Sequence, residues 1–336
     1  MLQQVTTREA LKQEEEPPSS GSWVQGLGIT NTSCCDAVLQ EVSAESNVLN
    51  KNILVVKLGG STLENQRMVV QDLINLQALG VYPVLVHGGG PAINTWLQAV
   101  HLPTHFERGF RVTDAPTLEI VCMVLRGQIN EHLVLLTEQM GGKAVGLSGT
   151  DGNMIQAHIA DKRLGLVGEI ETIDPTLLQE LIEEGYIPII APLGLGPDGS
   201  CLNLNADLVA AHLAKALHAE RLVFLSDVAG ICDANGTLIS ELSEAQAHRL
   251  IEEGVIRGGM IPKVLACLEA VTTVPGVHVV DGSEPHILLR EISKKPSTGT
   301  MILPQDAQRD VHLAKTAPDG RFGDVPASVL ELHPRG

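Results

Sequence analysis

The chain has 336 residues, of which 44% are hydrophobic and only 2% aromatic, and its formal net charge is -17. A chain of this length and apolar content can bury one large core or two modest ones, which predicts a folded, enzyme-sized protein. The lack of clustered Lys and Arg argues against nucleic acid as a partner, and the scarcity of aromatic residues argues against stacking platforms for single strands. The six cysteines form no CxxC pair and have no His at ligand spacing, so we expect reduced thiols and no metal held by protein ligands.

The two ends of the chain differ in composition from its middle. Residues 1–50 are rich in Glu, Pro, Ser and Gln and predict an N-terminal extension, partly disordered or with one helix near Ala37 to Val48. Residues 304–336 predict a flexible tail, which leaves 51–303 as the folded domain. We find no apolar signal core, and no apolar run approaches the roughly 20 residues of a membrane span. The sequence therefore predicts a cytoplasmic protein without a membrane partner.

Short apolar runs alternate with helical segments through the middle of the chain. Each run is too short for an independent helix, and most end at Gly, Ser or Pro, which favours buried strands. The alternation is typical of an α/β fold with a doubly wound, mainly parallel sheet. The predicted strands are ILVVKL from Ile53, VYPVLV from Val81, AVGLS from Ala144, YIPIIAPL from Tyr186, LVFLS from Leu222 and VHVV from Val277.

Two of the intervening segments have helical periodicity. Leu177 to Ile182 gives one apolar face, with Asp174 and Pro175 suited to its start and Gly185 to its end. The second predicted helix covers 206–218. In open α/β sheets ligands bind beyond the carboxyl ends of the strands, so we looked for chemistry in the residues that follow each run.

Glycine-rich turns follow the first two predicted strands. In VVKLGGS, Lys57 precedes Gly59 and Gly60, which would let backbone amides approach a phosphate beside a mobile positive charge. On its own this motif fits a phosphate site and an ordinary strand turn equally well. In VLVHGGGP, residues 88–90 are three successive glycines, whose entropy cost favours a site with close backbone approach. His87 in the same motif is more typical of a hydrogen-bonded structural residue than of a catalyst.

Two further motifs carry polar groups whose role the sequence leaves open. In RGFRVT, an Arg fork from Arg108 or Arg111 can bind a carboxylate, although a surface Arg on a hairpin is equally plausible. In LNLNADLVAAHL, the residues Asn203, Asn205 and Asp207 precede or open a helix, where Asn and Asp are common caps. One cap is enough, and in an extended approach all three side chains would point the same way, which favours a site.

A lysine in the first turn of another predicted helix completes the charged candidates. In GGMIPKV, Lys263 is close to the positive end of the helix dipole, so a compensating anion is expected, with a snorkelling surface Lys as the alternative. GLGPDG at 194–199 matches a dinucleotide fingerprint, but Pro197-Asp198-Gly199 predicts a turn where the fingerprint needs a helix. GGKA at Gly141 lacks the other residues of a P-loop, which disfavours that class of kinase.

Taken in order, KLGGS, VHGGGP, GFRVT, NLNAD, LSDVAGI and GGMIPK resemble the acetylglutamate kinases of the amino-acid kinase family, over roughly Asn52 to Leu303. The resemblance implies an open αβα sandwich around a mainly parallel sheet, with the acyl acceptor in the N-terminal half and ATP, accompanied by Mg²⁺, in the C-terminal half. It implies transfer of the ATP γ-phosphoryl group to the side-chain carboxylate of N-acetyl-L-glutamate, a reaction that needs positioning and charge neutralisation.

The same resemblance implies a role for each matched residue. Two lysines would neutralise the phosphoryl group and an aspartate would orient them; glycines would bind the phosphate and the acceptor; and Arg and Asn would hold the acceptor. The implied residues are Lys57, Lys263 and Asp207 for catalysis, Gly89, Gly90, Arg111 and Asn203 for the acceptor, and Gly59, Gly60, Ser226, Asp227 and Gly230 for phosphate and ATP.

The C-terminal segment SEPHILLREISKKPSTGTMI resembles that of arginine-inhibited members, which implies His286, Glu291 and Gly299 as arginine-effector residues. The resemblance also implies a homo-oligomer, either a dimer or a hexamer, and raises the possibility of a PII-type regulator. Alternatives within the family are kinases of an acetylaminoadipate-type acceptor, aspartate or uridylate. Outside it, the alternatives are a non-catalytic nucleotide or arginine sensor and, less favoured, a dehydrogenase.

Overall fold

The computed structural model describes residues 52–59, 65–107, 109–292 and 299–304. The predicted extension at 1–50, with its helix, lies outside the described residues, and so does almost all of the predicted tail. Gly60 and Arg108, two residues that the sequence motifs singled out, also lie outside them.

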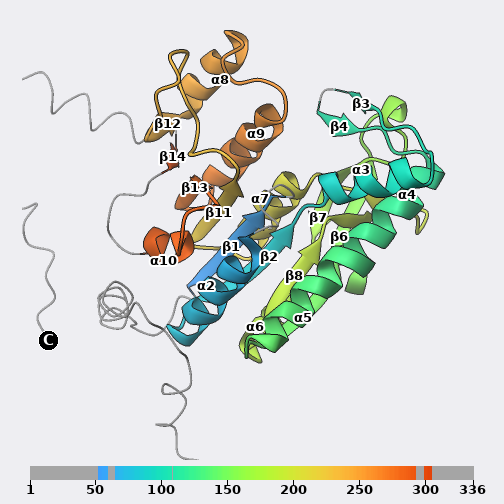
Figure 1. Cartoon of the computed structure of the whole chain (residues 1–336), viewed down its shortest axis with the longest axis horizontal. Coiled ribbons are helices and arrows are strands. Elements are labelled where there is room, and N and C mark those ends of the chain that lie inside the picture. The colour runs from blue at the N-terminus through green and yellow to red at the C-terminus, as the bar shows by residue number, and fades with distance from the viewer. Residues whose placement is uncertain (1–51, 60–64, 108, 293–298, 305–336) are drawn as a thin grey trace, which may run out of the picture.

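The centre of the fold is an eight-stranded sheet in the order β12-β14-β13-β11-β1-β2-β8-β5 (Figure 1). Neighbouring strands pair in parallel except β13 with β14, which are antiparallel. All six predicted apolar runs form strands of this sheet, so that prediction is confirmed; β12 and β14 were not predicted. The bounds are β1 (Ile53–Leu58), β2 (Tyr82–His87), β5 (Ala144–Ser148), β8 (Ile187–Ala191), β11 (Arg221–Ser226), β12 (Glu241–Ser243), β13 (Gly276–Asp281) and β14 (Thr300–Leu303).

Helices cover both faces of the sheet, which confirms the predicted αβα architecture. Strand β1 shows how the two layers form: Leu54 and Val56 pack into the core on one face, whereas Ile53 and Val55 pack into the core on the other. The first face is covered by α2 (Gln66–Ala78), α3 (Gly90–Ala99), α4 (Ala115–Cys122), the π-helical η3 (Met123–Asn130), α5 (Glu131–Gln139) and α10 (Ile287–Ile292), and the second by α6 (Thr176–Glu183), α7 (Ala206–Ala216), α8 (Glu244–Glu252) and α9 (Met260–Val271).

The predicted helix signals correspond to real helix ends. The carboxylate of Asp174 accepts a hydrogen bond from the backbone N–H of Thr176 at the start of α6, and Gly185 has φ +78° just past its end. Helix α7 begins at the predicted residue and ends at Ala216, two residues before the predicted end. His218 has φ +51°, a conformation that cannot continue a right-handed helix.

Short strands outside the main sheet escaped prediction. A second sheet has the order β10-β9-β6-β7, and a small hairpin joins β3 and β4. GLGPDG forms the turn between the antiparallel strands β9 and β10, with φ +81° at Gly199, which confirms that it is not a dinucleotide fingerprint. The bounds are β3 (Phe106–Glu107), β4 (Phe110–Arg111), β6 (Ile155–Ile159), β7 (Gly168–Ile173), β9 (Leu193–Leu195) and β10 (Cys201–Asn203), with the 3₁₀ turns η4 (Asp151–Asn153) and η5 (Lys162–Leu164).

The continuous helical segment Ala115–Gln139 is long and apolar enough to cross a membrane by length and composition alone, and the described residues contain one such segment. The sequence analysis missed it because charged and polar residues interrupt its apolar stretches. In the structure 44% of its most apolar window is buried inside the domain, including Val121, Leu125 and Leu133 in the core. Core helices pass the same test, so the segment is weak evidence for a membrane partner.

Strand β1 separates two parts of the sheet. Strands β2, β8 and β5 continue the sheet on one side, and β11, β13, β14 and β12 continue it on the other (Figure 1). Successive strands are therefore added first on one side of β1 and later on the other, which makes this position a topological switch point. In open α/β sheets a crevice forms there, at the carboxyl ends of the strands. Lys57 and Gly59 lie at that end of β1.

Candidate active site

Three charged side chains from distant parts of the chain meet beside the carboxyl end of β1. The Nζ of Lys57 lies 2.8 Å from Oδ1 of Asp207, and the Nζ of Lys263 lies 3.4 Å from the same oxygen. All three residues are at least nine-tenths buried. One carboxylate therefore holds two ammonium groups, and with both lysines protonated the cluster has a surplus of one positive charge.

Each member of this cluster is placed by the element that carries it. Side chains alternate along β1, so Lys57 points to the same face of the sheet as Val55, which is the face covered by α7 and α9. Asp207 is in the first turn of α7 and Lys263 is in the first turns of α9, where its Nζ also lies 5.5 Å from the ring centre of Phe224. Helices α7 and α9 pack against each other, which brings their N-terminal turns together.

Burial and charge act in opposite directions on the ionisation of the cluster. Burial lowers the pKa of Lys57, and the neighbouring Asp207 opposes that shift without cancelling it. Burial alone would raise the pKa of Asp207, but the two ammonium groups together outweigh it and keep that pKa below its ordinary value. Asp207 is therefore a fixed anion that keeps two positive charges in place, and it is not a candidate general base at neutral pH.

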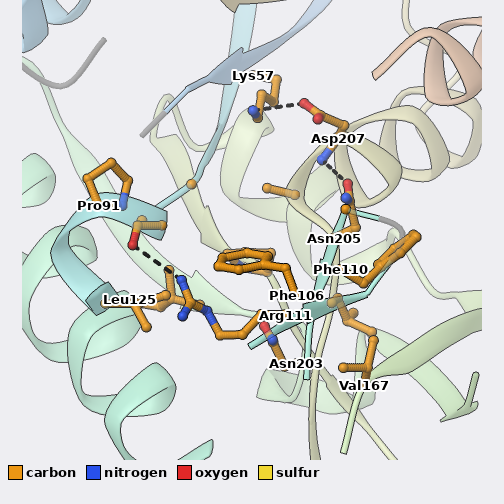
Figure 2. A pocket seen from close by; sticks show the side chains of 18 residues that line it. Lys57, Pro91, Phe106, Phe110, Arg111, Leu125, Val167, Asn203, Asn205 and Asp207 are labelled. Atoms are coloured by element: carbon orange, nitrogen blue, oxygen red, sulfur yellow. Dashed lines mark hydrogen bonds and ion pairs between the residues drawn. The ribbon is translucent and has the colours of Figure 1, made fainter. Parts of the chain in front are cut away.

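A cavity of about 350 Å³ opens beside this cluster. Lys57 and Asp207 line one part of it, and Arg111, Phe106 and Leu125 line another (Figure 2). The remaining lining residues come from the glycine turn after β2, the start of α3, the β3–β4 hairpin, the residue before β7, the end of β8 and the approach to α7. They are Gly88, Gly89, Gly90, Pro91, Ile93, Gly109, Phe110, Val167, Pro192, Asn203, Leu204, Asn205 and Ala206.

Arg111 places a buried positive charge in the cavity. Its Nη2 donates to Oδ1 of Asn94 at 2.6 Å and to the backbone oxygen of Gly90 at 3.4 Å, and its guanidinium lies 4.7 Å from the ring centre of Phe106. Its Nη1 is buried and has no hydrogen-bond partner. Burial lowers the pKa of Arg111, and an orphaned buried donor of this kind is satisfied by an anionic ligand.

The glycine turn after β2 leads directly into α3, whose N-terminus borders the cavity. Gly89 is the N-cap residue, and a Cβ on it would come within 2.7 Å of side-chain carbons of Leu125 and Ile129. Gly90 has open space where a Cβ would stand. The backbone N–H groups of a helix N-terminus favour negatively charged ligands, so the turn and Arg111 are each suited to a negatively charged group.

The cap reading of NLNAD is confirmed for Asn205, while a role of the motif in ligand binding stays a prediction. The side chain of Asn205 accepts hydrogen bonds from the backbone N–H groups of Asp207 and Leu208, so it is the N-cap of α7. Asn203 donates from Nδ2 to Oγ1 of Thr113 at 3.1 Å. Asn203, Asn205 and Asp207 all line the cavity, as the extended approach predicted.

The predicted nucleotide residues lie at the same edge of the sheet but do not line this cavity. Ser226 ends β11, one residue beyond the paired residues Leu58 and Leu225, so it is the neighbour of Gly59 across the two strands. Asp227, which follows it, is exposed. Gly230 has a structural explanation of its own, since a Cβ there would lie 2.7 Å from side-chain atoms of Leu238 and Thr300.

His87 is structural, as predicted. It is fully buried, its Nδ1 lies 3.1 Å from the backbone oxygen of Gly88, and its Nε2 lies 3.1 Å from Nδ2 of Asn130. The neutral tautomer that carries its proton on Nδ1 satisfies both contacts. Burial lowers the pKa of His87 to about 4, which keeps the ring uncharged at neutral pH.

The three predicted effector residues are all engaged in local structure. Nδ1 of His286 lies 2.8 Å from Oδ1 of the buried Asp72 in α2. The carboxylate of Glu291 is buried 2.6 Å from Nδ1 of His278, although the two groups lack the alignment of a hydrogen bond. At Gly299 a Cβ would lie 2.2 Å from the backbone oxygen of Val279, so only glycine fits beside β13.

Sequence reasoning missed two residues of the site. Asn94 orients Arg111, and Phe106 stacks on it. Asn94 sits at a solvent-facing position of a helix, where Asn has no distinctive pattern. Phe106 could have been noticed, because a chain with only four Phe residues places one of them in GFRVT and another three residues before it.

Comparison with known proteins agrees with this fold. The model of the amino acid kinase family matches residues 52–281. The chain therefore belongs to the amino acid kinase family. Proteins named acetylglutamate kinase are 46% identical over 260 residues in Syntrophomonas wolfei, covering 74% of this chain and 90% of the relative, and 41% identical over 281 residues in Thermosynechococcus vestitus, covering 81% and 95%.

Solved structures show the same architecture. The protein smu.665 from Streptococcus mutans superposes with a TM-score of 0.67 at 30% identity, covering 76% of this chain and 99% of that one. N-acetylglutamate synthase from Neisseria gonorrhoeae, solved with coenzyme A and N-acetyl-glutamate, gives a TM-score of 0.70 at 24% identity, covering 80% of this chain and 63% of that one. At that identity the second likeness supports the fold alone.

Proposed function

We propose that this member of the family is an N-acetyl-L-glutamate 5-kinase, which transfers the γ-phosphoryl group of ATP to the side-chain carboxylate of N-acetyl-L-glutamate. The observation that carries the proposal is the cluster of Lys57, Lys263 and Asp207, of which Lys57 and Asp207 line one part of a cavity that has Arg111 at another. The relatives named acetylglutamate kinase, matched over at least 90% of their length, support the choice of acceptor.

The charges suit the difficulty of the reaction, in which a carboxylate must approach a phosphate. Lys57 and Lys263 would neutralise the phosphoryl group in flight, and Asp207 would hold both in position without taking a proton. The amides at Gly59 and Gly60 would contact the transferring phosphate. The transfer needs no covalent enzyme intermediate, because in-line positioning and charge neutralisation supply the stabilisation.

The acceptor would occupy the cavity with its two carboxylates toward opposite parts. Arg111 would bind the α-carboxylate, Asn203 its acetylamino group, and the amides of Gly89 and Gly90 would hold the carboxylate that is to be phosphorylated. About 350 Å³ suits a ligand of this size.

The nucleotide would bind beyond β11. Ser226, Asp227 and Gly230 would border ATP, whose γ-phosphate would then face Lys57 across the adjoining ends of β1 and β11. Mg²⁺ needs oxygen ligands, and we propose that it arrives on the ATP phosphates, where it would neutralise charge between them. Asp207 is committed to two lysines, so it does not suit that ion.

One experiment separates the candidate reactions. Purified protein is given MgATP with N-acetyl-L-glutamate, an acetylaminoadipate-type acceptor, aspartate or UMP, and any acyl phosphate is trapped with hydroxylamine. Hydroxamate is expected with N-acetyl-L-glutamate and little or none with the other acids. A larger yield with another acid would reassign the substrate, and ADP formed with UMP alone would point to a nucleotide kinase. ATP binding without turnover of any acceptor would favour a sensor.

Regulation and assembly stay proposals that the resemblance alone supports. We propose a cytoplasmic homo-oligomer, dimer or hexamer, inhibited by arginine through the region of His286, Glu291 and Gly299, with a PII-type protein as a possible partner. Mass photometry would give the oligomeric state directly. An activity curve that stays flat through millimolar arginine would remove the effector role.

A further inference from the structure

The two terminal amino groups of Arg111 differ in their hydrogen bonding: Nη2 has partners and Nη1 has none. Nη2 already donates to two oxygens of α3, the side-chain oxygen of Asn94 at 2.6 Å and the backbone oxygen of Gly90 at 3.4 Å. Nη1 is buried beside the cavity without a partner. Of the two terminal amino groups, only Nη1 is left for a ligand, so the orientation of the planar group decides where a carboxylate can bind.

The contact with Asn94 is the one that fixes this orientation. Stacking on Phe106 at 4.7 Å holds the guanidinium plane but lets the group slide and turn within it. The bond to Gly90 is 3.4 Å long and correspondingly weak. The 2.6 Å bond to Asn94 is short and strong, and it determines which edge of the guanidinium faces α3.

We infer that Asn94 is a positioning residue that makes the acceptor site specific for a substrate with an α-carboxylate, by fixing the guanidinium of Arg111 at the cavity wall while leaving Nη1 without a partner and the charge uncompensated. A neutral amide oxygen orients the guanidinium, whereas a carboxylate at the same place would neutralise it and repel the incoming anion. Among the described residues Arg111 has no carboxylate partner, so its charge is reserved for a ligand. The inference rests on the proposed function.

Asn94 is well suited to this role because the fold does not depend on it. Asn94 is exposed on α3, whereas Ile93 and Leu97 anchor that helix in the core. A substitution at position 94 should therefore change the orientation of Arg111 without unfolding the helix. The neighbouring Thr95, also exposed, donates a hydrogen bond from its hydroxyl to the backbone oxygen of Pro91 and provides a matched control on the same turn.

The test compares two acceptors that differ only in the α-carboxylate, N-acetyl-L-glutamate and N-acetyl-4-aminobutyrate. In Asn94→Asp, which changes the charge but hardly the shape, kcat/KM for N-acetyl-L-glutamate should fall by about tenfold to a hundredfold, mostly through KM. For N-acetyl-4-aminobutyrate it should change by less than about twofold. Asn94→Ala should show the same selective loss to a smaller extent, while KM for ATP stays unchanged.

Arg111→Ala supplies the background that separates positioning from packing. In this background Asn94→Asp should have no further effect on either acceptor, because the group that it acts through has been removed. Thr95→Ala should behave as the wild type with both acceptors. Equal losses for the two acceptors in Asn94→Asp, or a loss that persists in the Arg111→Ala background, would overturn the inference.

Calorimetric binding of the two acceptors repeats the comparison without turnover and keeps the two proposals apart. If Asn94 has no positioning role, the wild type prefers N-acetyl-L-glutamate and Asn94→Asp retains the same ratio of the two Kd values. If the proposed function is wrong, the wild type neither binds nor phosphorylates N-acetyl-L-glutamate, and the inference falls with it.

Discussion

Two regions of this domain bury charged side chains, and they do so differently. At the carboxyl end of β1, two lysines share one aspartate beside a cavity. Around α10, each buried acid has one histidine: Asp72 lies beside His286 and Glu291 beside His278. The first region has an excess of positive charge, and the second has one partner for each acid.

This difference in charge balance separates a ligand site from structural pairing. Burying an uncompensated charge is costly, so a surplus persists where a ligand of opposite sign completes it. The acid–histidine pairs around α10 do not line the cavity, and their removal is expected to affect stability. Loss of either lysine in the first region should therefore reduce catalysis, and substitutions in the second should reduce stability.

The largest expected effect is the loss of either lysine. Lys57→Ala or Lys263→Ala should reduce kcat for acyl-phosphate formation by about 10³-fold or more, because each removes a charge that stabilises the phosphoryl group in the transition state. Stability should change little, since Asp207 keeps the other lysine as its partner. Initial rates from a coupled ADP assay measure the effect.

Lys215→Ala is the matched control for both variants. Lys215 is in α7, as Asp207 is, but it pairs with Glu269 away from the cavity. Its replacement should leave kcat within about twofold of the wild type, as for most surface ion pairs. Near-wild-type turnover in both lysine variants would remove the catalytic role of the cluster and with it the contrast between the two regions.

The next effect is that of Asp207→Asn, which leaves two ammonium groups together without their carboxylate. Removing one partner of a buried ionic cluster costs roughly 3–5 kcal/mol, so the free energy of unfolding in urea should fall by about that amount. Added ATP should also raise the thermal stability of the variant more than that of the wild type, because the phosphates of ATP replace the negative charge of Asp207. A variant as stable as the wild type, with no extra gain from ATP, contradicts this account.

His87 provides a third kind of burial, in which a titratable group is kept neutral. Its pKa is lowered by burial to about 4 from the ordinary 6.5, so between these values the unfolded chain binds more protons than the folded one. This contribution to stability is complete above pH 6.5 and is lost as the pH falls toward 4, by roughly 3 kcal/mol in all. His87→Gln removes it.

Urea unfolding at several pH values tests this titration. Between pH 7 and pH 4 the wild type should lose more stability than His87→Gln does, whatever the offset between the two proteins at neutral pH. If stability falls equally with pH in the two proteins, His87 has an ordinary pKa in the folded protein and burial does not keep its ring neutral.

The fold was predictable where the sequence pattern reflects burial on both faces of the sheet. Strand β1 is buried at every position, and the other central strands read as similar continuous apolar runs. Strand β7 alternates between intermediate and exposed residues, and β12 has three residues. Strand β7 is an edge strand without buried residues, and β12 pairs with β14, which is distant in the chain, so no local apolar run marks either strand.

The site was predictable as a set of motifs but not as a geometry. Glycine turns and helix caps pointed to Lys57, Asp207 and Lys263 one at a time, and only the packing of α7 on α9 and β1 shows that one oxygen serves both lysines. Asn94 had no local signal, because its role depends on an arginine on another element. Residues that act through a partner need the tertiary structure to be seen.

The smallest expected effect tests the balanced pairing near α10. His286→Ala removes the partner of the buried Asp72, whose pKa burial already raises, and should cost about 1 kcal/mol of stability at pH 7 with no change in kcat. Asp72→Asn in the same background should recover part of the loss, since it removes the charge left without a partner. The control is His248→Ala. His248 is exposed on α8, one turn after its partner Glu244, and its replacement should change neither stability nor kcat. A fall in kcat without a loss of stability would mean that His286 has a role in activity and not in structural pairing. Arginine titrations of His286→Ala would then show whether that role is in the response to arginine.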